Sequence, residues 1–93
     1  MTDITQTQRG IKETCREIEN MLLEKNRKYG DSAIYPLRIF SHTDPVEQIN
    51  IRLDDKLSRL RSAQGDDRED AELDLIGYLI LKRIARQLQE PNP

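Results

Sequence analysis

Residues 73–81 read LDLIGYLIL, and Asp74 is the one charged residue among them. A helix built on this stretch carries apolar side chains on nearly all sides, which is typical of a helix that is buried all round. We predict that the helix runs from about residue 67 to 89, with Pro91 stopping it. The main apolar face predicted from its spacing consists of Leu73, Gly77, Ile80, Leu81, Ile84 and Leu88.

The chain has only 93 residues, so one copy buries a modest core. A helix that is apolar on all sides has more apolar surface than the rest of a single small domain can cover. The sequence therefore predicts a homo-oligomer that forms through helix 67–89.

A second helix is predicted just upstream, and its start has a clear signature. Asp44 is a good N-cap residue, Pro45 suits the first helical position, and Glu47 stands where it completes a capping box. We expect this helix to end near Ser62. Its predicted apolar face consists of Val46, Ile49, Leu53, Leu57 and Leu60.

The N-terminal helix is predicted from about Thr7 to Lys28, with Gly30 as the left-handed residue beyond its end. Apolar residues recur along it at helical spacing, with Cys15 among them as a small core residue. An irregular connection, residues 31–43, follows. Pro36 interrupts this connection, and its predicted apolar anchors are Ile34, Leu37, Ile39 and Phe40.

Together these elements predict an all-α fold: three main helices and an irregular or short helical connection, in a bundle completed by oligomerisation. A single helical domain is expected over residues 1–93, with residues 1–6 and 90–93 as frayed tails. The 15 Lys and Arg residues against 17 Asp and Glu argue against general nucleic-acid binding. No apolar run is long enough for a membrane span and the N-terminus is polar, so a cytoplasmic location is expected.

Charged residues at the core-facing edges of the helices form the candidate site. At about 100° per residue, Lys56 falls at the edge of the apolar face of its helix, and Arg52 and Arg59 continue the same ridge. Asp70 and Asp74 lie at the rim of the third helix's predicted face, one turn apart. Buried charges need partners. Two interpretations are open: Lys56 forms an ion pair with Asp74 or Asp70, or the charges line a cleft for a divalent cation and phosphate oxygens.

Three elements carry a resemblance to known proteins. They are a Lys-Asn-x-x-Tyr-Gly-Asp element at 25–31, an Arg-x-x-x-Lys-x-x-Arg helix at 52–59, and DLIGY at 74–78. In this order they resemble the nucleotide modification associated domain 1 family of small phage and bacterial proteins. More distantly, they are similar to the all-α nucleoside triphosphate pyrophosphatases of the MazG type. The resemblance covers roughly residues 18–86.

The resemblance implies a magnesium-dependent pyrophosphohydrolase that converts a nucleoside triphosphate to the monophosphate and pyrophosphate. It implies that Glu24, Asp70 and Asp74 bind magnesium and carry the catalysis. The residues implied for nucleotide and phosphate binding are Lys25, Asn26, Tyr29, Asp31, Arg52, Lys56, Arg59 and Tyr78.

The sequence departs from the MazG pattern at the first acidic helix, where a Glu-x-x-Glu pair is expected. Glu17 is followed by Asn20, and Glu24 by Arg27. Two alternatives to hydrolysis therefore stay open. One is a phage-type protein that binds and sequesters a nucleotide or cyclic nucleotide without turnover. The other is a structural, oligomeric interaction protein whose charges are ion pairs.

Overall fold

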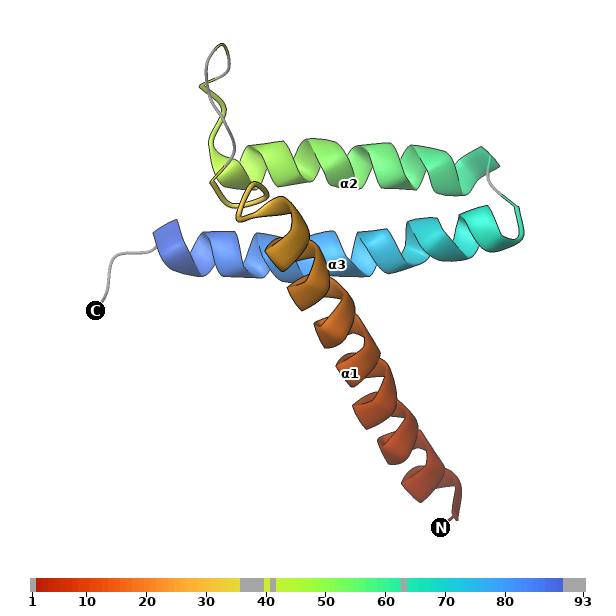
Figure 1. The fold of residues 1–93 in the computed structure, drawn as a ribbon. Helices are drawn as coiled ribbons and strands as arrows, with labels where there is room; N and C mark the ends of the chain where they lie inside the picture. The colour runs from red at the N-terminus through yellow and green to blue at the C-terminus, as the bar shows by residue number, and fades with distance from the viewer. Residues whose placement is uncertain (1, 36–39, 41, 63, 90–93) are drawn as a thin grey trace. The chain divides into compact units, whose positions relative to one another are not determined.

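The computed structural model describes residues 2–35, 40, 42–62 and 64–89. In this part of the chain the regular structure consists of α1 (Thr2–Tyr29), α2 (Pro45–Ser62) and α3 (Asp66–Gln89), and no strand occurs (Figure 1). The predicted all-α fold is confirmed. The chain divides into two compact units, Met1–Gly30 and Asp31–Pro93. The single domain over residues 1–93 stays a prediction.

Helix α1 forms the first unit and is longer than predicted. It begins at Thr2 instead of Thr7, so residues 2–6 are helical and not a frayed tail. The helix ends at Tyr29, and Gly30 follows with a φ of 70°. Because a Cβ is disfavoured in this left-handed region, glycine terminates the helix at low cost, as predicted.

The apolar residues of α1 differ in burial. Ile18 is buried and Leu22 is half-buried, whereas Ile11 is exposed. Cys15 is also exposed, so the prediction that it is a core residue was wrong. Helical spacing placed Cys15 beside apolar neighbours, but spacing does not establish that a partner covers them.

Helix α2 begins as its capping signature predicts. The side-chain Oδ1 of Asp44 accepts a hydrogen bond from the backbone N–H of Glu47 at 3.0 Å, and the carbonyl of Asp44 accepts one from Gln48 at 3.1 Å. The carboxylate of Glu47 accepts a bond from the side chain of Asn50 instead of closing the capping box. The Asp44 side chain thereby satisfies one of the N–H groups that a helix start leaves without intrahelical partners.

Helices α2 and α3 lie side by side and antiparallel, as Figure 1 shows. At the turn between them, Gly65 has a φ of 62°, and its carbonyl accepts hydrogen bonds from the N–H groups of Arg68 and Glu69. The Nη1 of Arg68 donates to the backbone carbonyl of Leu60 at 3.0 Å. Leu60 is in the last turn of α2, where carbonyls lack helical partners, so Arg68 ties the two helix ends together.

The core of the second unit lies between α2 and α3. Ile49 and Leu53 from α2 pack with Ala85 from α3 and with Ile34 from the segment that follows α1. The residues packed against this core are Val46, Leu75, Tyr78 and Leu81. Ile49 is only 1% exposed and is the largest side chain of the cluster that is fully buried.

The connection after α1 is anchored in part as predicted. The carbonyl of Asp31 accepts hydrogen bonds from the N–H groups of Ile34 and Tyr35 at 3.3 and 2.8 Å, and this turn directs Ile34 into the core. Phe40 is 94% exposed, so its prediction as an anchor was wrong. The remaining residues singled out in this connection, Pro36, Leu37 and Ile39, lie outside the described residues.

The face of α3 that meets α2 differs from the predicted one. The residues on this inner face that are buried or pack against the core are Ala71, Leu75, Tyr78, Leu81 and Ala85. Of the predicted face, Gly77 is buried and Leu81 packs against the core, but Leu73, Ile80, Ile84 and Leu88 are 37–58% exposed. On α2, Leu57 is likewise exposed. A helix that is apolar all round has no angular preference of its own, so packing selected the face. No helix within the described residues is long and apolar enough to cross a membrane.

Candidate functional site

Two contacts join α2 to α3 along one edge of the hairpin. The Nζ of Lys56 lies 3.2 Å from Oδ2 of Asp74. The guanidinium of Arg52 lies 6.0 Å from the centre of the Tyr78 ring, within the range of a cation–π contact. Lys56 is four residues after Arg52, and Asp74 is four residues before Tyr78. The two contacts therefore share one antiparallel register and lie one helical turn apart.

The Lys56–Asp74 ion pair is partly removed from water. Their side chains are 14% and 27% exposed. Lys56 reaches this position because it follows Ile49 by seven residues and so shares the inner side of α2. A charge this shielded depends on its partner, because desolvation without pairing is costly. An ion pair of Lys56 with Asp74 or Asp70 was one of the two predicted interpretations, and the structure contains the pair with Asp74.

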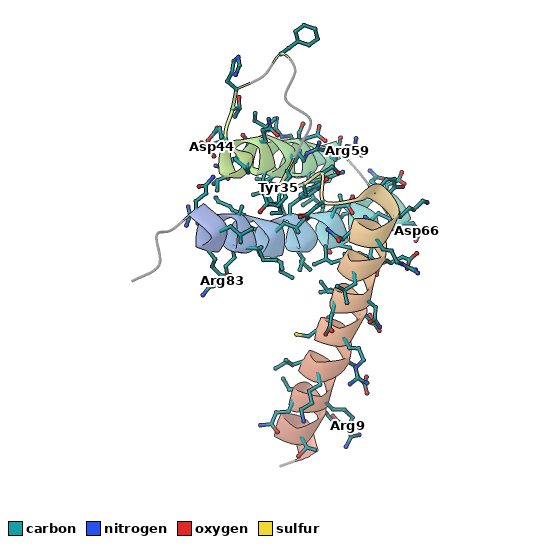
Figure 2. The ribbon with its side chains drawn as sticks, turned by 60° about the vertical axis from the view of Figure 1, so that its left-hand side comes forward. Arg9, Tyr35, Asp44, Arg59, Asp66 and Arg83 are labelled. Carbon is teal, nitrogen blue, oxygen red and sulfur yellow. The ribbon has the colours of Figure 1, made fainter. Side chains whose placement is uncertain are left out.

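Arg59, the third cation of the predicted ridge, is at the surface of α2 (Figure 2). Its Nε lies 3.4 Å from Oδ2 of Asp55, four residues earlier on the same helix, and both side chains are more than half exposed. Sequence analysis did not single out Asp55, although the i, i+4 spacing of opposite charges signals such a pair. The ridge thus consists of exposed guanidinium groups at Arg52 and Arg59 on either side of the shielded Lys56.

The two predicted acids of α3 have different surroundings. Asp70 is exposed, whereas Asp74 is half-buried against Lys56. Within the part of the chain that the structure describes, no three His, Cys, Asp or Glu side chains are grouped so that they could hold a metal ion.

The remaining predicted residues belong to α1 and to the turn after it. Glu24 forms an ion pair with Arg27 on its own helix. Lys28 Nζ lies 5.3 Å from the ring centre of Tyr29. Lys25 and Asn26 are exposed on α1, and Asp31 begins the second unit, where its carbonyl closes the turn to Ile34 and Tyr35. That these residues form one site with Arg52 and Lys56 stays a prediction.

No known protein family matches this chain, and no curated protein or solved structure matches it. Fold and geometry alone therefore define its class. It is an all-α protein whose second unit is an antiparallel helical hairpin, with cations along one edge. The resemblance to the nucleotide modification associated domain 1 family stays a prediction.

Proposed function

We propose that the chain binds a nucleotide at the cationic edge of the α2–α3 hairpin. The observation that carries the proposal is the pair of cross-helix contacts one turn apart, Arg52 with Tyr78 and Lys56 with Asp74. Guanidinium and ammonium groups bind phosphate oxygens through charge-assisted hydrogen bonds. An aromatic ring beside them offers a surface against which a base stacks. A nucleotide, with its phosphates and its base, uses both features at once.

The spacing of the cations supports a ligand with more than one phosphate group. Arg52 and Arg59 are seven residues apart on α2, which corresponds to about 10 Å along the helix axis. Their exposed guanidinium groups are accessible to an anion from solvent. Lys56 lies between them, and a bound phosphate oxygen would share its ammonium group with Asp74.

Hydrolysis to the monophosphate and pyrophosphate is the second candidate function. The position of Asp70 and Asp74 one turn apart on α3 favours it, together with the resemblance to the MazG type. The described side chains do not fit the implied magnesium site, because the carboxylate of Asp74 forms an ion pair with Lys56 and that of Glu24 forms one with Arg27. We therefore derive no catalytic step through a metal ion. The binding proposal includes two further points: the chain sequesters a nucleotide as phage-type proteins do, and it is located in the cytoplasm.

Thermal unfolding in the presence of nucleoside triphosphates and cyclic nucleotides, with and without magnesium, tests the proposal. A ligand that binds only the folded chain at 100 times its Kd adds about 2.7 kcal/mol of stability and raises the Tm. We expect Arg52→Ala to abolish most of this rise. The control is Arg61→Ala, which removes the same charge from the opposite side of the same helix.

Each outcome of this experiment separates the candidates. If no nucleotide raises the Tm, the binding proposal is wrong and a purely structural role is favoured. Equal losses in Arg52→Ala and Arg61→Ala would show non-specific attraction and would contradict the site. Magnesium-dependent release of pyrophosphate that Asp70→Asn abolishes would establish hydrolysis in place of simple binding.

A further inference from the structure

Helix α3 has a second apolar face, which we refer to as the outer stripe. Its residues are Leu73, Ile76, Leu79, Ile80 and Ile84, all between 37% and 51% exposed. The stripe lies on the other side of α3 from the inner face, which meets α2. In Figure 2, Arg83, which is four residues after Leu79 on α3, points away from α2. Soluble proteins rarely leave so many large apolar side chains of one helix uncovered, and such a face is typical of an interaction surface.

The charges along α3 are distributed unevenly. The acids all lie in its first half: Asp66, Asp67, Glu69, Asp70, Glu72 and Asp74. Basic residues follow in the second half, at Lys82, Arg83 and Arg86, and Arg68 is the one cation in the first half. The helix is therefore electrostatically complementary to a reversed copy of itself.

Three residues set the register of such a pairing. Glu72, Leu79 and Arg86 follow one another at intervals of seven residues, so they form one line along the edge of the outer stripe, to which Leu79 belongs. All three are exposed. When two copies of this line run antiparallel, each acid lies opposite a base, and Leu79 at the centre lies opposite Leu79.

We infer that α3 packs through the outer stripe against α3 of a second copy of this chain, in antiparallel orientation around a two-fold axis near Leu79. Glu72 of each copy faces Arg86 of the other, and Leu79 meets Leu79. Within the stripe, next to this line, the same register places Ile76 of one copy opposite Ile80 of the other. The contact is isologous, so it closes as a dimer. A parallel pairing would put Glu72 beside Glu72 and Arg86 beside Arg86, which like-charge repulsion disfavours.

This inference does not rest on nucleotide binding, because the outer stripe and the Arg52–Lys56 edge are different surfaces of the hairpin. Sedimentation velocity over a range of concentrations tests it. We expect the full chain to sediment as a dimer and Leu79→Glu as a folded monomer, with helicity checked by circular dichroism. A wild-type chain that stays monomeric at all concentrations would overturn the inference. The stripe would then be covered in some other way.

A charge exchange tests the register. Glu72→Arg and Arg86→Glu should each raise the dimer Kd by at least about tenfold, because each creates two like-charge contacts per dimer. The double variant with both substitutions should return the Kd to within about threefold of the wild-type value, since the pairing is restored. A dimer whose Kd is the same in all four proteins contradicts the proposed register.

Cysteine cross-linking tests the orientation, in chains that also carry Cys15→Ser. Mixed Glu72→Cys and Arg86→Cys chains should form an interchain disulfide on oxidation. Glu72→Cys alone should not, because an antiparallel pair separates the two positions by about 20 Å along the helix axis. Cross-linking of Glu72→Cys to itself would mean a parallel pairing, and the absence of any cross-link in the mixture would also overturn the inference.

Discussion

The ammonium group of Lys56 and the carboxylate of Asp74 lie 3.2 Å apart across the α2–α3 hairpin, with 14% and 27% of their side chains exposed. This pair joins two helices, whereas Arg27–Glu24, Arg59–Asp55 and Arg68–Glu72 are each within one helix. The Lys56–Asp74 pair is one of the contacts between the two aligned helices, together with Arg52–Tyr78, and it borders the proposed nucleotide site.

A double-mutant cycle with Lys56→Met and Asp74→Asn should give a coupling free energy of about 1–3 kcal/mol in the free energy of unfolding. The reason is that each single substitution leaves a shielded group without its partner. Urea denaturation measures the four free energies. The control cycle, Arg59→Met with Asp55→Asn, should give at most about 0.5 kcal/mol, because that pair is more than half exposed. Equal coupling in both cycles would show that burial of the Lys56–Asp74 pair has no energetic consequence.

Asp44→Ala should destabilise the hairpin by about 1 kcal/mol, because it removes the acceptor for the N–H of Glu47 at the start of α2. Asp54→Ala is the matched control, since Asp54 is exposed in the middle of the same helix. The control should change the stability by less than about 0.5 kcal/mol. Urea denaturation distinguishes the two, and an unchanged midpoint in Asp44→Ala would argue against the cap.

Two glycines of the first unit should respond to alanine with opposite signs. Gly10 is inside α1 with no neighbouring atom within 4 Å of an added Cβ, so Gly10→Ala should stabilise the helix by about 0.5–1 kcal/mol. Gly30 has a φ of 70°, so Gly30→Ala should cost about 1–2 kcal/mol. Helicity measured by circular dichroism as a function of temperature reports both effects. Changes of the same sign would contradict the conformation assigned to one of these positions.

Ile49→Ala should cost about 2–5 kcal/mol, because it leaves a cavity in the core, where Ile49 is 1% exposed. Ile51→Ala removes the same atoms two residues further along α2, at a side chain that is 57% exposed. We expect this control to change the stability by less than about 1 kcal/mol. Similar losses in both variants would mean that a further surface covers Ile51.

Features of α2 and α1 that depend on neighbours in the chain were predictable. The cap at Asp44, the helix end before Gly30 and the position of Lys56 on the inner side of α2 all follow from local spacing and backbone preferences. Each involves residues within two turns of one another, so no knowledge of the partner helix is needed. The start of α1 at Thr2 is the exception: glycine is unfavourable inside a helix, yet α1 continues through Gly10 to this earlier start.

What the sequence by itself determined is therefore the helices, their ends apart from the start of α1, and the identity of the charges along them. Only the tertiary structure decided which side of α3 is inner and which acid meets Lys56. Residues 73–81 are apolar in every direction, so the inner face was selected by packing against Ile49 and Leu53. Asp70 and Asp74 were equal candidates one turn apart, and the antiparallel register of the hairpin chose Asp74 because it lies directly opposite Lys56.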